Sequence, residues 1–178
     1  MSDLLNTLSF FTTWKEVCES QVDLLFKNWS NPRTYSSIIL DMDNSVLDQI
    51  SKKLCINYYR EYYSLDAVFY DESDLVPDRP ENTTWLRRIR IAFEHENNID
   101  GIYQEISHLL ITNCDLRVLV TYPNVDEKVH LKYIQDLMIG SNSSSSIPIL
   151  VIFGWKEENN YILWEGYEFK QTGWILLR

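Results

Sequence analysis

The sequence predicts an α/β protein in which helices flank a mixed β-sheet. Segments with apolar residues at three- and four-residue spacing alternate with short apolar segments of strand length. Residues 87–97 alternate with a period of two, as a half-buried strand does. Residues 116–122 are apolar on both faces, as a buried parallel strand is. A strand, a helix and a further strand in this order form a crossover unit, which is typical of an α/β sheet.

The first half of the chain is predicted to hold two helices and two strands. The first helix stops at Asn31-Pro32. The second begins at Asn44 or Ser45, since either side chain can accept a hydrogen bond from the first turn. The predicted elements are a helix over 13–29, a connector over 32–44, a helix from 44 or 45 toward 59–63, a strand over 65–70, an acidic and proline-containing excursion over 71–80, and a strand over about 85–95.

The second half alternates helices with strongly apolar strands. Asn113 and Gly140 are predicted to end its two helices. A run that is almost all serine, residues 141–146, is expected to be a flexible link. The predicted elements are a helix from about 102, a strand over 116–122, a helix after Asp126, and strands over 147–155, 161–168 and 173–178.

Length and charge bound the class of protein. At 178 residues and 45 % hydrophobic, the chain fits one domain with a substantial core. The formal net charge of −10 counts against a sequence-independent grip on nucleic acid, which rests on lysine and arginine. It does not exclude a local basic groove, and it equally suits a protein whose partner is basic.

The sequence predicts a cytoplasmic location without a membrane span. No run of about 18 apolar residues exists, and the N-terminus lacks the basic-then-apolar order of a signal peptide. Three widely spaced cysteines, Cys18, Cys55 and Cys114, are odd in number and fit free thiols in a reducing compartment.

Three carboxylates are candidates for a shared site. Glu94 and Glu96 lie two residues apart at the end of a predicted strand, so their side chains point to the same face. Asp66 lies near the start of the preceding strand. If the two strands pair antiparallel, Asp66 comes close to Glu94. Converging carboxylates suit Mg²⁺ or Mn²⁺, which take oxygen ligands, although a solvated strand end explains the two glutamates alone equally well.

This arrangement resembles the PD-(D/E)XK nuclease superfamily, whose fold is that of restriction endonucleases. The resemblance rests on a helix, a strand with Asp66, a strand ending in Glu94-His95-Glu96, a further helix and a buried strand. It covers roughly residues 45–122 and is similar to a group of uncharacterised prokaryotic proteins with that fold. It implies a single domain with a restriction-endonuclease-like core over 45–122, an N-terminal helical extension over 1–44, and a C-terminal helix and strands over 123–178.

The resemblance also implies roles for individual residues. Asp66 and Glu94 would hold the Mg²⁺ or Mn²⁺ ion, with the main-chain carbonyl of His95 as a further ligand. Glu96 would position the attacking water. Glu61, expected at the end of the preceding helix, resembles the accessory acidic ligand of some members.

Two alternatives within the site stay open. Glu96 stands where the family most often has lysine, although a few restriction enzymes are similar in carrying glutamate there. Pro77-Asp78 is a second candidate for the metal-binding aspartate. It ranks behind Asp66 because it lies among acids and prolines, whereas Asp66 precedes an apolar strand.

Neighbouring polar residues have both a structural and a functional interpretation. Arg88 and Arg90 share the face of Glu94 and either neutralise it or contact a phosphate. Asn97 turns the chain or contacts nucleic acid. The His95 side chain points to the core face, where a satisfied hydrogen bond is expected.

The sequence therefore yields two functional hypotheses. The first is a divalent-metal-dependent endonuclease that hydrolyses DNA phosphodiester bonds. Cutting both strands of a duplex would need two copies, which makes a homodimer an expectation. The second is a non-catalytic acidic protein on the same fold that binds or inhibits a basic partner. The net charge and the missing lysine favour this second hypothesis.

Overall fold

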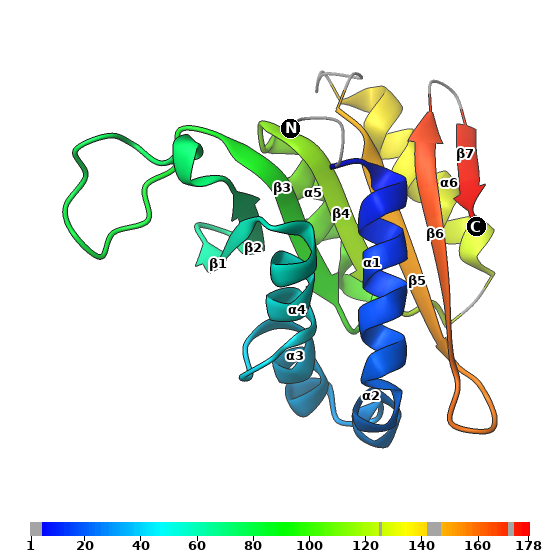
Figure 1. The fold of residues 1–178 in the computed structure, drawn as a ribbon. Coiled ribbons are helices and arrows are strands. Elements are labelled where there is room, and N and C mark those ends of the chain that lie inside the picture. The colour runs from blue at the N-terminus through cyan, green and yellow to red at the C-terminus, as the bar shows by residue number, and fades with distance from the viewer. Residues whose placement is uncertain (1–4, 125, 142–146, 171–172) are drawn as a thin grey trace.

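A single seven-stranded mixed sheet forms the centre of the protein (Figure 1). The computed structural model describes residues 5–124, 126–141, 147–170 and 173–178. The strands lie in the sheet in chain order. β3 pairs parallel with β4, β4 pairs parallel with β5, and every other pair is antiparallel. The strands are β1 (Asn57–Tyr62), β2 (Leu65–Tyr70), β3 (Ile89–Glu96), β4 (Cys114–Thr121), β5 (Ile149–Lys156), β6 (Ile162–Lys170) and β7 (Gly173–Leu177).

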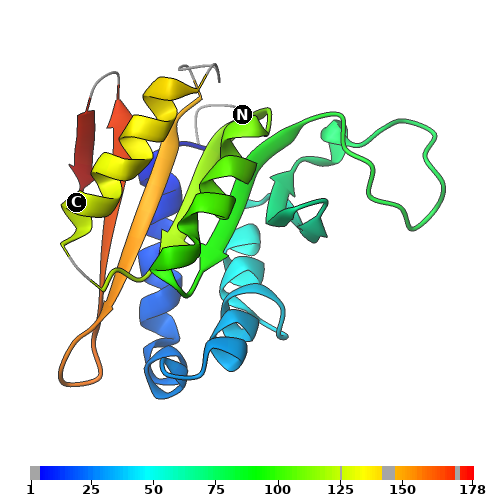
Figure 2. The ribbon, with the colours of Figure 1, turned by 180° about the vertical axis from the view of Figure 1, so that it is seen from behind.

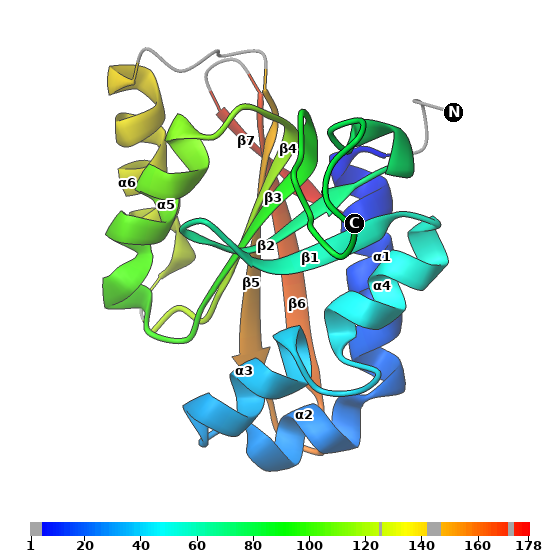
Figure 3. The ribbon, with the colours of Figure 1, turned by 90° about the vertical axis from the view of Figure 1, so that its left-hand side faces the viewer.

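Helices cover both faces of this sheet, as Figures 2 and 3 show from two directions. The predicted α/β class with a mixed sheet between helices is therefore confirmed. One layer comprises α1 (Thr7–Ser20), α2 (Val22–Asn28), α3 (Pro32–Leu40) and α4 (Val46–Leu54), and the other comprises α5 (Ile102–Ile111) and α6 (Glu127–Gly140). Two short 3-10 helices, Glu72–Asp74 and Ile99–Gly101, precede β3 and α5 respectively.

A separate hydrophobic core fills each side of the sheet. Under α1 to α4, Trp14 contacts the rings of Phe93 and Trp164 at centroid distances of 6.0 and 5.3 Å. Under α5 and α6, Ile106 and Leu109 pack on the opposite sheet face. Because both faces of β4 and β5 are buried, these strands are predominantly apolar, with Asp115, Arg117 and Thr121 as the polar residues of β4.

The N-terminal layer contains more helix than the sequence predicted. The single helix over 13–29 is two helices, the first of which starts earlier, at a capping box formed by Asn6 and Ser9. The prediction of a connector over 32–44 is wrong, because residues 32–40 form α3. Asn31 caps that helix and Pro32 occupies its first turn, where a missing amide hydrogen costs nothing.

The prediction that the second helix runs toward residues 59–63 is also wrong. Ser45 caps α4 as expected, but the helix ends at Leu54 because Cys55 adopts a left-handed conformation with φ 52°. The tyrosine-rich segment that follows is strand β1, which forms a hairpin with β2. Aromatic residues favour strands, so composition outweighed the helical spacing here.

The second half follows the prediction closely, with helix and strand ends shifted by a few residues. Of the predicted serine-rich link, residues 142–146 lie outside the described residues. Cys18, Cys55 and Cys114 are free thiols. Within the described ranges, no helix is long and apolar enough to cross a membrane.

Candidate functional site

The antiparallel pairing of β2 with β3 places Asp66 beside Glu94. Ala67 pairs with Phe93 in this register, so Asp66 lies opposite Glu94. The main-chain N–H of Asp66 donates to Glu94 Oε2 at 3.0 Å, and the main-chain N–H of His95 donates to Asp66 Oδ2 at 2.8 Å. The predicted approach of these two carboxylates is confirmed, while their role as metal ligands stays a prediction.

Helix α5 brings two further groups to the same point. His108 Nδ1 lies 3.1 Å from Glu94 Oε1 and 3.6 Å from Glu105 Oε2. One ligand atom from each of Glu94, Glu105 and His108 lies within 4.8 Å of the others. We call Asp66, Glu94, Glu105 and His108 the acidic cluster.

Sequence reasoning did not find the two helical members of the acidic cluster. Glu105 lies in the first turn of α5, where the helix dipole alone favours an acidic residue, so its position in the sequence does not indicate a site. The spacing of three residues between Glu105 and His108 places them on one helix face. That spacing shows only that the two side chains are neighbours, and the packing of α5 against β3 determines where they point.

Burial makes the acidic cluster electrostatically unfavourable when its carboxyls are ionised. The Glu94 side chain is only 1 % exposed. Desolvation by burial raises the pKa of Glu94 well above its usual range, and the charges of Glu105 and Asp66 raise it further. Burial likewise raises the pKa of Asp66 and of Glu105. A bound cation would relieve this cost, because it favours the charged form of every carboxyl around it.

Glu96 and Glu61 lie at the margin of the acidic cluster. Glu96 is half-buried, its Oε1 accepts a hydrogen bond from the N–H of Asn98 at 2.6 Å, and its charge raises the pKa of Asp66. The expected helical position of Glu61 is wrong, because this residue lies in β1 with φ 50°. Its charge also raises the pKa of Asp66, so Glu61 remains near the acidic cluster from a strand.

His95 points away from the acidic cluster into the opposite core. Its ring Nε2 lies 2.8 Å from the Tyr122 hydroxyl and its ring stacks on Tyr35. Burial lowers the pKa of His95 to about 3, so the side chain is neutral. The predicted core histidine is thus found with a hydrogen bond at Nε2, whereas Nδ1 has no partner among the described residues. The predicted role of its carbonyl as a ligand remains a prediction.

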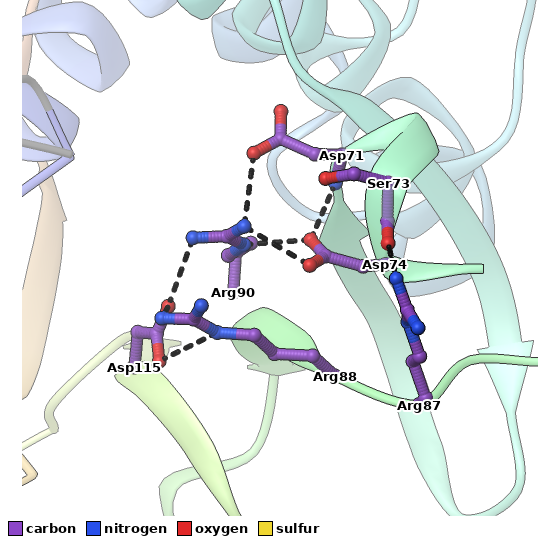
Figure 4. A network of polar contacts seen from close by, with 7 residues as sticks. All are labelled: Asp71, Ser73, Asp74, Arg87, Arg88, Arg90 and Asp115. Atoms are coloured by element: carbon purple, nitrogen blue, oxygen red, sulfur yellow. Dashed lines mark hydrogen bonds and ion pairs between the residues drawn. The ribbon is translucent and has the colours of Figure 1, made fainter. Parts of the chain in front are cut away.

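Arg88 and Arg90 belong to a different network, at the opposite end of β3 (Figure 4). Arg88 forms two hydrogen bonds with Asp115, and Arg90 forms two with Asp74. Arg90 also makes an ion pair with Asp71 at 3.3 Å. These arginines therefore neutralise aspartates of the excursion and of β4 rather than Glu94, which corrects one of their two interpretations. Phosphate binding by these arginines stays a prediction.

Asn97 and Asp78 have structural settings of their own. The Asn97 amide donates to Ser36 Oγ, which ties the end of β3 to α3. Asp78 is exposed, has φ 54°, and lies in the excursion that leads to the start of β3. Because Glu94 lies near the end of that strand, the register favours Asp66 over Asp78 as the partner of Glu94.

Comparisons with known proteins leave the family of this chain open. No family model matches the chain, and no curated protein or solved structure gives a significant match. The likeness to the PD-(D/E)XK superfamily therefore rests on the residues and on the order of the elements.

Proposed function

We propose that the protein is a divalent-metal-dependent nuclease that hydrolyses DNA phosphodiester bonds at the acidic cluster. The observation that carries the proposal is the convergence of Glu94, Glu105 and His108 from β3 and α5, with Asp66 opposite Glu94 on β2. Carboxylate oxygens with one imidazole nitrogen suit Mn²⁺, and the carboxylates alone suit Mg²⁺. The buried Glu94 carboxyl is a further argument, because its ionisation becomes favourable beside a cation.

The residues would divide the work according to their positions. Asp66, Glu94, Glu105 and His108 would hold the ion, which when bound polarises a phosphodiester oxygen and lowers the pKa of water. The N–H of His95 fixes the Asp66 carboxylate, and the N–H of Asp66 fixes that of Glu94, so the two strands orient both groups. Glu96, at the less buried margin, would accept the proton of the attacking water.

Cleavage of plasmid DNA and of oligonucleotides with Mn²⁺ or Mg²⁺ tests this proposal. We expect Glu94→Gln to lower the rate by more than about a hundredfold, because the isosteric amide cannot supply the charge that holds the ion. Glu168→Gln is a matched control, since Glu168 is a buried glutamate of the same sheet that pairs with Lys170 instead.

Equal cleavage by wild type and Glu94→Gln would contradict catalysis at the acidic cluster, because the activity would then belong to another site or to a contaminant. The control excludes a trivial loss of activity: we expect Glu168→Gln to retain cleavage, which shows that a buried glutamate of this sheet can be replaced without damage to the fold.

A non-catalytic acidic protein on the same fold is the second candidate. The specific observation in its favour is that Arg88 and Arg90 are engaged with aspartates, so they do not form a basic edge beside Glu94. The net charge of −10 would then serve to attract a basic protein partner. Binding of Mn²⁺ at the acidic cluster without cleavage of any DNA would favour this candidate.

A further inference from the structure

The hairpin between β1 and β2 exposes an aromatic side chain three residues before Asp66 of the acidic cluster. Tyr62 pairs with Leu65, so Tyr63 and Ser64 form the turn. Tyr63 is 92 % exposed, the largest exposure among the exposed large hydrophobic residues of the described chain. Large aromatic side chains are usually at least partly buried, so this degree of exposure is unusual.

Three tyrosine rings form a continuous edge-to-face row on this hairpin. The Tyr63 ring lies perpendicular to that of Tyr62 at a centroid distance of 4.9 Å, and Tyr62 lies perpendicular to Tyr59 at 6.1 Å. The Tyr62 hydroxyl accepts a hydrogen bond from the N–H of Leu86 at 3.1 Å, which anchors the middle ring. Tyr59 is 43 % exposed. We call Tyr59, Tyr62 and Tyr63 the tyrosine row.

The backbone of the hairpin holds Tyr63 outward at an energetic cost. Glu61 and Tyr63 have φ values of 50° and 55°, in the left-handed region that favours glycine or asparagine. Two-residue hairpin turns usually have glycine or asparagine at their positions of positive φ. A bulky residue with a strained backbone and an exposed ring gains little for the fold, so the strain is a reason to look for a contact outside the chain.

The position of the hairpin relates it to the acidic cluster. Asp66 follows Tyr63 by three residues and bonds through its N–H to Glu94. Figure 3 shows the turn between β1 and β2 extending toward α5, which carries Glu105 and His108. An open surface depression lies along β1, lined by Tyr58, Tyr59, Arg60 and Glu61.

The charge of the protein restricts what such a row can bind. Affinity for duplex DNA comes chiefly from cationic contacts to phosphates, whereas this chain carries a net charge of −10 and its Arg88 and Arg90 are paired with aspartates. Aromatic rings bind nucleic acid differently, by stacking on the faces of bases. In a duplex those faces are covered by neighbouring base pairs, so stacking requires unpaired bases.

We propose that the tyrosine row stacks on unpaired bases next to the phosphodiester bond presented to the acidic cluster, so that the substrate is single-stranded DNA rather than duplex. This inference rests on the proposed nuclease function for its catalytic part. Tyr63, with the most exposed ring, makes the principal stacking contact. Tyr62 is a positioning residue, because its hydroxyl is bound to Leu86.

Fluorescence anisotropy of a labelled oligothymidylate and of a labelled duplex, in buffer with EDTA so that no cleavage occurs, tests binding alone. We expect the single strand to bind more tightly than the duplex, with a shallow dependence on salt because few phosphates are contacted. Tyr63→Ala should weaken single-strand binding about tenfold, and Tyr63→Phe, which keeps the ring, should restore it. Tyr161→Ala is the control, since Tyr161 is 48 % exposed on the β5–β6 turn.

The outcomes separate this inference from the proposed hydrolysis. Equal binding of single strand and duplex, unchanged binding by Tyr63→Ala, or no binding of either probe would overturn the inference. Cleavage that depends on Glu94 but is as fast on duplex and is unaffected by Tyr63→Ala would leave the nuclease standing and remove the role of the tyrosine row. Tyr63-dependent binding without any cleavage would support the tyrosine row and contradict the nuclease.

Discussion

At the scale of single residues, the central feature is a buried carboxyl group that has an imidazole and further acids as neighbours. Glu94 is placed by main-chain hydrogen bonds and by His108, not by a lysine or arginine. Ionised carboxylates packed this closely repel each other and lose hydration. Carboxyl groups with perturbed pKa values cluster at functional sites, and binding of a divalent cation is the simplest function that fits this arrangement.

The raised pKa values predict how the stability of the metal-free protein depends on pH. The folded state of each cluster carboxyl keeps its proton to a higher pH than the unfolded state does. Above about pH 4.5 the unfolded chain therefore binds fewer protons than the folded protein does. The free energy of unfolding then falls as the pH rises, by up to about 1.4 kcal/mol per pH unit for each such proton. Glu94→Gln removes one of these groups.

Urea denaturation between pH 5 and pH 8 in EDTA measures this effect. We expect Glu94→Gln to gain stability relative to wild type as the pH rises, because the variant has no carboxyl to ionise at that position. Parallel pH profiles for the two proteins would mean that the Glu94 carboxyl has its ordinary pKa in the folded state.

At the scale of the elements, the sequence predicted strands better than the helices before them. Two patterns were sufficient to predict strands. The alternation of residues 89–96 indicates a strand with two different faces, and the apolar run of β4 indicates a buried strand. The helix α3 was not predicted because Asn31-Pro32 indicates the end of one helix and the start of another equally well. The strand β1 was missed because its start depends on the left-handed Cys55.

The acidic cluster was predictable only where strand register determines it. Antiparallel pairing alone brings Asp66 to Glu94, and both were predicted. The contributions of Glu105 and His108 depend on how α5 rotates and packs on the sheet, which a single sequence does not specify. Arg88 and Arg90 show the same limit, since their partners come from the excursion and from the start of β4.

The packing of α1 on the sheet leads to a prediction for Gly166 in β6. A Cβ atom at this position would lie 2.8 Å from the ring of Phe11, which is fully buried on α1. Gly166→Ala should therefore push α1 from the sheet and lower the free energy of unfolding by about 1–3 kcal/mol.

Chemical denaturation compares this variant with Gly173→Ala, where a Cβ would meet nothing within 4 Å. We expect the control to change the free energy of unfolding by no more than about 0.5 kcal/mol. Equal effects of the two substitutions would show that the close contact between α1 and β6 is not what stabilises this face.

At the scale of the whole molecule, the sheet separates the aromatic core from the acidic cluster. The face covered by α1 to α4 holds the aromatic core and the neutral His95, and the face covered by α5 and α6 holds the acidic cluster. Successive side chains at the end of β3 point to opposite faces of the sheet, so Glu94 and Glu96 lie on one face and His95 lies on the other. The acidic net charge is compatible with attraction of divalent cations to this site.

Calorimetric titration of the protein with Mn²⁺ tests the central claim, that the acidic cluster is a divalent cation site, most directly. We predict that wild type and Glu168→Gln bind one Mn²⁺ per chain, and that Glu94→Gln and Asp66→Asn each bind it at least about tenfold more weakly. Undiminished binding by both cluster variants, or no binding by the wild type, would contradict the claim.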